Sequence, residues 1–189
     1  MRYLSILYVA LGLSLLVGST EAYAQNSMSV KPVAERAEYN PMIFGAFLEH
    51  FDNQVYGGVF SPGSPLADED GFRKDVIEAV KELKVPIVRW PGGCFVSAYH
   101  WKDAVGPDRQ SVWDKAWQVE DPNTFGTDEF VKWCRKVGCE PFNVKYWSIG
   151  NENWGMHELG EKSSAEWGPL VTESAKVLSG RSVTFLFIE

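Results

Sequence analysis

The chain has little of three things that mark common classes of protein: positive charge, cysteine and long apolar runs. It has 18 Lys and Arg residues and 25 Asp and Glu residues, which gives a net charge of −7, and the basic residues form no run or patch. We therefore expect neither nucleic acid nor an anionic membrane as a partner. After residue 24, no apolar stretch approaches the roughly 20 residues that cross a bilayer.

Cysteine and histidine are also too sparse to indicate a metal centre. The cysteines are Cys94, Cys134 and Cys139, and the histidines are His50, His100 and His157. They form no CxxC, no HExxH and no Cys/His cluster, so we expect no metal and no cofactor. The odd count leaves at least one thiol without an intramolecular partner, and a Cys134–Cys139 bridge stays open. His50 and His100 are interpreted as hydrogen-bonded structural residues.

Residues 1–24 have the pattern of a signal peptide. Arg2 supplies the positive charge, Leu4 to Val17 forms an apolar core, and Ala22-Tyr23-Ala24 is a small-x-small cleavage site. The alternative, a membrane anchor, is disfavoured because the apolar run is short for a spanning helix. We expect an exported protein, secreted or periplasmic, that begins at Gln25 and has no membrane segment after cleavage.

The most informative stretch is Gly150-Asn151-Glu152-Asn153-Trp154-Gly155. It follows Val144 to Ile149, a short run rich in β-formers that predicts a buried strand. Glu152 then lies between amides that can hold hydroxyls and indoles that can shed water and raise the pKa of a carboxyl group. Its two interpretations, a general acid/base and an ordinary surface glutamate, are about evenly balanced on this stretch alone.

Two further apolar runs end in charged residues. Met42 to Leu48 precedes Glu49-His50, and Val85 to Val88 precedes Arg89-Trp90-Pro91-Gly92-Gly93-Cys94. In a (β/α) barrel, the C-terminal ends of the strands carry the active site. Three strand-like runs that end in charge therefore favour a functional site. Eight tryptophans and seven tyrosines suit a sugar-binding cleft, although they are also ordinary core residues.

Together these motifs resemble the α-L-arabinofuranosidases of glycoside hydrolase family 51. The resemblance runs from about Asn40 to about Leu178. Its motifs are Phe44 to His50, Gly71 to Val76, Val88 to Phe95, Tyr99 to Asp103 and Ile149 to Gly155. It implies a glycosidase that releases terminal arabinofuranose from arabinan or arabinoxylan with retention of configuration. Family enzymes are often oligomers, and that alternative stays open for this chain.

The resemblance also implies roles for individual residues. Glu152 corresponds to the acid/base and Asn151 to the residue that binds the sugar 2-hydroxyl, while Glu49, Arg89 and Cys94 line the subsite of the arabinofuranosyl ring. A surface charge for Arg89 and a core position for Cys94 are the alternatives. Retention also needs a nucleophilic carboxylate about 5–5.5 Å from the acid/base. The family places it on the seventh strand, and neither Glu49 nor Glu189 is interpreted as its replacement.

The spacing of apolar residues predicts three helices. The first has Phe72, Val76, Val80 and Leu83 on one face, with Asp68 to Asp70 at its N-terminal end. The second is capped by Thr127, has an apolar face of Phe130, Val131, Cys134 and Val137, and ends at Gly138. The third begins at the capping box Ser163 to Glu166 and is kinked or restarted by Pro169. Trp101 to Asp121 is interpreted as a long loop.

The expected fold is α/β: a partial (β/α)8 TIM-type barrel, roughly its first half and incomplete. Cleavage after residue 24 would leave 165 residues, against about 250 for a complete barrel. The expected organisation is a signal peptide over 1–24, an N-terminal extension or strand over 25–40 and the incomplete barrel over 41–189. Ser27 to Val33 and Ser182 to Ile188 are candidate strands.

The junction Phe142–Asn143 breaks the barrel pattern. Gly138 to Pro141 resembles the entry to the third strand of the family, and Asn143 to Trp147 the entry to the fourth. Parallel neighbours need a crossover of a dozen or more residues, and none separates these segments. Either one unit is deleted or the two segments form a single strand.

Three hypotheses follow from this shortened pattern. The chain derives from an arabinofuranosidase and has itself little or no hydrolytic activity, because the nucleophile region is absent. Alternatively, it is a non-catalytic carbohydrate-binding remnant that keeps Glu49, Arg89 and Asn151. The third hypothesis is a non-functional truncated gene product, whose partial barrel exposes sheet edges and aggregates.

Overall fold

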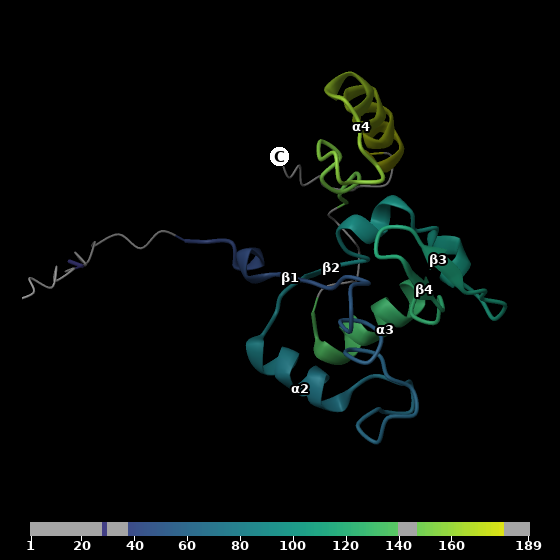
Figure 1. Ribbon diagram of the computed structural model, residues 1–189. Helices are drawn as coiled ribbons and strands as arrows, with labels where there is room; N and C mark the ends of the chain where they lie inside the picture. The colour runs from purple at the N-terminus through teal and green to yellow at the C-terminus, as the bar shows by residue number, and fades with distance from the viewer. Residues whose placement is uncertain (1–27, 30–37, 140–146, 180–189) are drawn as a thin grey trace, which may run out of the picture. The chain divides into compact units, whose positions relative to one another are not determined.

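The computed structural model describes residues 28–29, 38–139 and 147–179 (Figure 1). The chain divides into two compact units, residues 1–38 and 39–189, and the elements described below all lie in the second. The predicted signal peptide, the candidate strands over 27–33 and 182–188, and the Phe142–Asn143 junction fall almost entirely outside the described residues.

A strand–helix–strand unit opens the second compact unit. Strand β1 (Ala46–Phe47), helix α2 (Lys74–Leu83) and strand β2 (Val88–Arg89) follow one another, and the two strands pair in parallel. Ala46 lies opposite Val88 and Phe47 opposite Arg89. This is the repeating unit of parallel α/β folds, so the predicted α/β class is confirmed. In the described residues the strands form two separate pairs and no closed barrel.

Strand β1 is much shorter than the apolar run that predicted it. The first part of that run forms a 3-10 helix, η1 (Pro41–Phe44). The side-chain oxygen of Asn40 accepts a hydrogen bond from the Met42 N–H at 3.0 Å, and Pro41 occupies the first helical position. Capping and the fixed φ of proline therefore favour a helical turn over an extended strand at this point.

Helix α2 has its predicted position but not the whole of its predicted apolar face. Ile77 is buried on this helix, whereas Leu83 is 74% exposed. Phe72 is fully buried just before the helix begins. Lys84 adopts a left-handed conformation, with φ of +53°, and ends the helix directly after Leu83. The expectation that Leu83 packs in the core is wrong because the chain turns away there.

Helix α3 (Thr127–Val137) confirms the second predicted helix, including its end at Gly138, whose φ is +81°. Its N-cap is Gly126, not Thr127, and Glu129 accepts a hydrogen bond from the Gly126 N–H at 2.8 Å. A side chain at Gly126 would not fit, because its Cβ would lie 2.1 Å from the Ala104 carbonyl oxygen. Trp133 is buried on this helix although the periodicity did not select it.

The acidic segment before α2 pairs with α3. Lys136 Nζ lies 2.6 Å from Asp68 and 2.8 Å from Asp70, and Lys132 Nζ lies 2.8 Å from Asp70. Ion pairs as exposed as these contribute little to stability individually, because water screens them. These ion pairs hold the loop before α2 against α3, which also packs against α2.

The segment predicted as a long loop contains regular structure. The 3-10 helix η3 (Trp101–Ala104) is followed by an antiparallel hairpin of β3 (Val112–Asp114) and β4 (Val119–Asp121). Trp113 lies opposite Glu120. The loop prediction is wrong here, because three-residue strands are too short to show a clear period-2 alternation.

The third predicted helix is α4 (Ser164–Ser179), and one half of the predicted capping box is present, the bond from the Ser163 N–H to the Glu166 carboxylate. Glu166 Oε2 accepts from the Ser163 N–H at 2.9 Å and from the Ser163 hydroxyl at 2.7 Å. The helix runs through Pro169 without restarting. The strand predicted before Glu152 is wrong in its described part, since Trp147–Ile149 is irregular.

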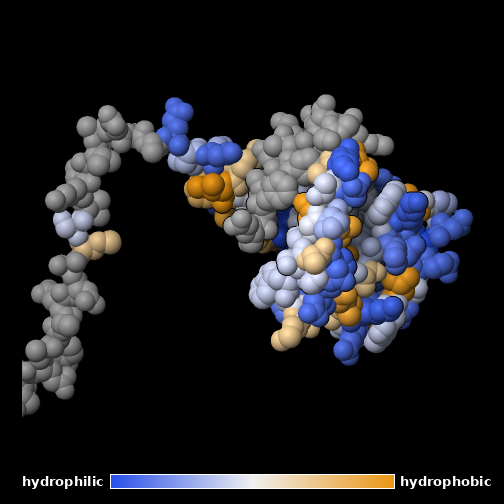
Figure 2. All heavy atoms as spheres, turned by 90° about the horizontal axis from the view of Figure 1, so that it is seen from above, coloured by the Kyte–Doolittle hydropathy of each residue, from blue (hydrophilic) through white to orange (hydrophobic). Residues whose placement is uncertain are grey.

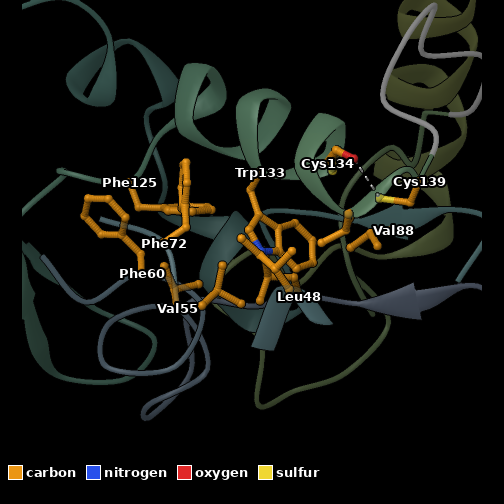
Figure 3. Close-up of a cluster of buried hydrophobic side chains, with 12 residues drawn as sticks. Leu48, Val55, Phe60, Phe72, Val88, Phe125, Trp133, Cys134 and Cys139 are labelled. Carbon is orange, nitrogen blue, oxygen red and sulfur yellow. Dashed lines mark hydrogen bonds between the residues drawn. The ribbon is translucent and has the colours of Figure 1, made fainter. Parts of the chain in front are cut away.

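The buried core joins β1, β2, α3 and the loop between β1 and α2. Leu48, Val88 and Trp133 lie together at one end, and Phe60, Phe72 and Phe125 form an aromatic cluster at the other (Figure 3). The three rings of this cluster have centroids 5.6–6.4 Å apart. On the face seen in Figure 2, hydrophobic residues lie scattered among hydrophilic ones. None of the helices in the described residues is long and apolar enough to cross a membrane.

We predict that Phe72→Ala lowers the free energy of unfolding by about 3–5 kcal/mol, because it leaves a cavity between Phe60 and Phe125. Leu83→Ala is the matched control, with an expected effect within about 0.5 kcal/mol, because Leu83 is exposed. Urea unfolding followed by circular dichroism measures both variants. Equal effects of the two substitutions would contradict this core.

Candidate functional site at the strand ends

The parallel pairing of β1 and β2 continues past both strands and places their C-terminal ends side by side. The Leu48 N–H donates to the Arg89 carbonyl at 2.9 Å, and the His50 N–H donates to the Pro91 carbonyl at 3.2 Å. Glu49 therefore lies next to the segment that begins at Arg89. Two of the predicted charged strand ends thus meet at one edge, as parallel strands require.

Glu49 packs directly on the two glycines after Pro91. A Cβ at Gly92, whose φ is +133°, would lie 2.2 Å from the Glu49 Cγ, and a Cβ at Gly93 would lie 3.1 Å from both carboxylate oxygens. Only glycine allows this approach at Gly92. The Glu49 Oε1 is buried and has no hydrogen-bond partner among the described residues. It therefore has unused capacity to accept a hydrogen bond.

Arg89 connects the strand ends to the loop that contains Glu152. Its Nη2 donates to the Asn151 Oδ1 at 3.4 Å, a long hydrogen bond, and its guanidinium carbon lies 4.7 Å from the centroid of the Phe47 ring. The Arg89 Nε is buried and has no partner in the described part of the chain. The interpretation of Arg89 as a plain surface charge is therefore wrong.

Asn151 is held from its other side by Glu158, a residue that the sequence analysis did not select. The Asn151 Nδ2 donates to one carboxylate oxygen of Glu158 at 3.0 Å, and the Ser97 hydroxyl donates to the other at 3.2 Å. Ser97 ends the 3-10 helix η2 (Cys94–Ser97), which follows the glycines. Nothing in the motif pattern marked Glu158, because a single glutamate in a polar loop has no sequence signature.

Cys94 lies beside the same carboxylate. Burial, a hydrogen bond to Glu158 and the negative charges of Glu158, Glu49 and Glu152 raise the pKa of the Cys94 thiol to about 12. The Cys94 Sγ and carboxylate oxygens of Glu152 and Glu158 lie within 4.8 Å of one another. Acidic groups commonly gather in this way without binding an ion, so this proximity by itself gives no argument for a metal.

Glu152 has a strained backbone and an open environment. Its φ is +41°, which is uncommon for a residue other than glycine and often marks functional loops. Its side chain is 52% exposed, and its Oε2 lies 3.2 Å from the His157 Nε2. Trp154 is 77% exposed. The flanking indoles therefore do not shield Glu152 from water in this structure.

A carboxylate oxygen of Glu158 lies within 4.8 Å of one of Glu152, so Glu158 is compared here with the second carboxylate of a retaining pair. Such pairs lie about 5–5.5 Å apart. Yet the Glu158 side chain has no exposed surface, and both of its oxygens accept hydrogen bonds. A nucleophile must reach the anomeric carbon of a bound sugar, so Glu158 is not placed to attack.

A buried polar network lies beneath the strand ends. The Trp90 indole N–H donates to the His50 Nε2 at 3.2 Å, and the His50 Nδ1 lies 3.1 Å from the Asp121 Oδ2. Because the indole can only donate, Nε2 carries the lone pair and the ring proton lies on Nδ1, toward Asp121. The predicted structural role of His50 is confirmed. His100, in contrast, is exposed.

The Asp121 carboxylate contacts three polar groups, which belong to His50, Tyr56 and Asn123. Besides facing His50, it accepts from the Tyr56 hydroxyl at 2.7 Å and from the Asn123 N–H at 2.8 Å. Burial by itself would raise the pKa of Asp121, but the contacts with His50, Asn123 and Tyr56 outweigh it and hold the pKa below its usual value. Burial and the Asp121 charge raise the pKa of the Tyr56 hydroxyl.

Comparison with known proteins connects this geometry to a family. The sequence model of the family described as "Alpha-L-arabinofuranosidase 1 domain" matches residues 79–141. An intracellular exo-alpha-(1->5)-L-arabinofuranosidase of Acetivibrio thermocellus is 39% identical over 194 residues, which cover 80% of this chain and 39% of that protein. The chain spans about two fifths of the length of the curated relatives it matches.

Solved structures agree with the sequence matches. The thermostable GH51 alpha-L-arabinofuranosidase from Thermotoga petrophila is similar with a TM-score of 0.73 and 38% identity, over 76% of this chain and 39% of that one. The alpha-L-arabinofuranosidase from Thermotoga maritima, in an arabinose complex, gives a TM-score of 0.72 and 38% identity, over 75% and 39%.

We predict that Asp121→Asn destabilises the chain by about 2–3 kcal/mol at pH 7, the usual size for hydrogen bonds to a buried charge. Because the folded pKa of Asp121 is depressed, its contribution is complete above the unfolded value of about 4 and is lost as the pH falls through the folded value. The difference between wild type and variant should therefore shrink in acid. Urea unfolding from pH 7 to pH 2 measures it, and a constant difference would contradict the network.

Proposed function

Because this chain is a relative of the glycoside hydrolase family 51 α-L-arabinofuranosidases, we propose that it carries the sugar-binding and acid/base part of such a glycosidase site. The observation that supports this most is the hydrogen bond between Arg89 and Asn151. It joins the charged ends of two parallel strands to the loop that contains Glu152. Chemically different motifs, far apart in sequence, thus gather where a barrel enzyme has its active site.

We propose that β1, α2 and β2 are the first units of a (β/α)8 barrel. In that arrangement Glu49, Arg89 and Cys94 line the subsite of an arabinofuranosyl ring, and Asn151 binds a sugar hydroxyl. The unpartnered Glu49 Oε1 and Arg89 Nε supply an acceptor and a donor for this purpose. A furanose ring offers several hydroxyls that can serve both.

Glu152 is the proposed acid/base. In a retaining mechanism it donates a proton to the glycosidic oxygen while a second carboxylate attacks the anomeric carbon and forms a covalent glycosyl-enzyme. Glu152 then removes a proton from the water that hydrolyses this intermediate. Its half-exposed side chain leaves room for a substrate and for water. The proposed substrates are arabinose-containing oligosaccharides or polysaccharides.

A binding role without turnover is the second candidate, and a specific observation favours it. Among the described residues, a carboxylate oxygen of Glu158 lies within 4.8 Å of one of Glu152, but the Glu158 side chain is buried and hydrogen-bonded. A double displacement needs an accessible second carboxylate, which Glu158 does not supply. We therefore expect this chain by itself to bind the sugar and to release none.

We predict that the chain binds L-arabinose and that Arg89→Ala weakens binding at least about tenfold, because hydrogen bonds from a charged group contribute roughly 1.5–3 kcal/mol. Lys81→Ala, an exposed change on α2, is the control and should leave the affinity unchanged. Isothermal titration calorimetry measures all three proteins. Absence of binding by the wild type would contradict the proposed site.

Hydrolysis is assayed in parallel with 4-nitrophenyl α-L-arabinofuranoside. We expect no turnover above that of the Glu152→Gln variant. Turnover that this substitution abolishes would instead establish the chain as a complete catalyst and would contradict the binding-only role.

We also propose that the chain is exported. The Acetivibrio relative is named as intracellular, so this proposal depends on the first 24 residues of this chain alone, and these lie outside the described residues. We predict that the protein recovered from its native host begins at Gln25. N-terminal sequencing tests this, and a protein that still begins at Met1 would contradict cleavage.

A further inference from the structure

Glu158 is an unusual residue for an exposed loop, because its carboxylate is completely buried. Among the described residues, its one ion-pair contact within 4 Å is to the His157 Nε2, at 3.9 Å, and that imidazole is itself 58% exposed. A buried carboxylate without a close cation is costly, and it persists only where other groups satisfy its oxygens. Here the amide of Asn151 and the hydroxyl of Ser97 satisfy them.

A carboxylate next to an asparagine determines which way the amide points. Both Glu158 oxygens accept hydrogen bonds, one of them from the NH2 group of Asn151, which therefore faces Glu158. The Oδ1 then faces Arg89, which can only donate, at 3.4 Å. A flipped amide would place its oxygen against the Glu158 carboxylate and its NH2 against the guanidinium. Both contacts would be repulsive, so Glu158 and Arg89 together select a single orientation.

Ser97 extends this arrangement to the strand end. It belongs to η2, the turn that also contains Cys94 and follows the glycines packed on Glu49. The two oxygens of Glu158 therefore hold the loop of Asn151 and Glu152 against the turn of Cys94. One buried side chain joins the two segments that carry the proposed subsite.

We propose that Glu158 is a positioning residue of the sugar site: it fixes the amide of Asn151 with Oδ1 toward Arg89 and anchors the Glu152 loop to Ser97. The orientation of the amide stands on this geometry alone, whereas its benefit for sugar binding rests on the proposed function. With the amide fixed, Asn151 presents a free lone pair and a second N–H in a constant geometry to a sugar hydroxyl.

Hydrogen exchange of the Asn151 side-chain amide tests the orientation without any ligand. Side-chain amide resonances are recorded by NMR on the full chain, and the Asn151 pair is assigned by its loss in Asn151→Asp. We expect its exchange in the wild type to be at least about tenfold slower than that of exposed Asn40, whose amide oxygen is its bonded atom. Equally fast exchange of the two amides would overturn the proposal.

Two substitutions separate hydrogen bonding from burial. In Glu158→Gln, the Oε1 can still accept from Asn151 and the Nε2 can donate to the Ser97 hydroxyl, so slow exchange of the Asn151 amide should persist. Glu158→Leu introduces an apolar side chain of similar size that cannot accept a hydrogen bond. Exchange of the Asn151 side-chain amide should then become at least about tenfold faster. Unchanged exchange in Glu158→Leu would overturn the proposal. If that variant fails to fold, the wild-type comparison with Asn40 still decides.

L-arabinose affinity tests the benefit of this orientation. We expect Glu158→Gln to bind within about threefold of the wild type and Glu158→Leu to bind at least about tenfold more weakly, a difference of roughly 1.4 kcal/mol. Equal affinities of wild type and Glu158→Leu would overturn the positioning role in binding. If the wild type binds no arabinose, the proposed function fails, while the exchange measurement still decides whether Glu158 orients Asn151.

Discussion

The imidazole of His50 is the contact on which the arrangement at the strand ends depends. Its two ring nitrogens join Trp90, which follows β2, to Asp121 at the end of β4, and the ring itself stacks on Phe95 with centroids 4.3 Å apart. His50 directly follows Glu49, and Trp90 directly follows Arg89. The hydrogen bond between Trp90 and His50 therefore holds the two chain segments together directly after the proposed sugar-binding residues Glu49 and Arg89. Backbone pairing alone, over strands of two residues, would hold these ends weakly.

Above this network, the polar side chains of the site carry more negative than positive charge. Glu49, Glu152 and Glu158 gather around Cys94 and raise the pKa of its thiol, while Arg89 is the cation that reaches Asn151. The same crowding explains why the buried Glu158 needs two hydrogen-bond donors. The contacts among Arg89, Asn151 and Glu158 therefore determine both the positions of the polar side chains at this edge and the charge around them.

The sequence was most informative where chemistry and periodicity agree. The charged strand ends, the parallel strand–helix–strand unit and the C-terminal end of α3 were predictable, because glycine caps, buried apolar runs and strand-end charges each have a physical signature. The hairpin of β3 and β4 was missed because its strands are short. Glu158, Ser97 and Asp121 were missed because their importance arises from contacts between segments far apart in sequence. The environment of Glu152 was left open between shielding by tryptophans and exposure to water, since tryptophans adjacent in sequence do not have to cover a side chain in space.

The central claim is that the ends of β1 and β2 and the loop around Glu152 form one arabinofuranosyl subsite. NMR titration of the full chain with L-arabinose tests it most directly, because every backbone amide reports separately on binding. The account predicts that the shifted resonances cluster at Glu49, Arg89 to Cys94 and Asn151 to Glu152, with little change on α2. Shifts that instead gather on the β3–β4 hairpin or α4, or a titration without any shifts, would contradict it.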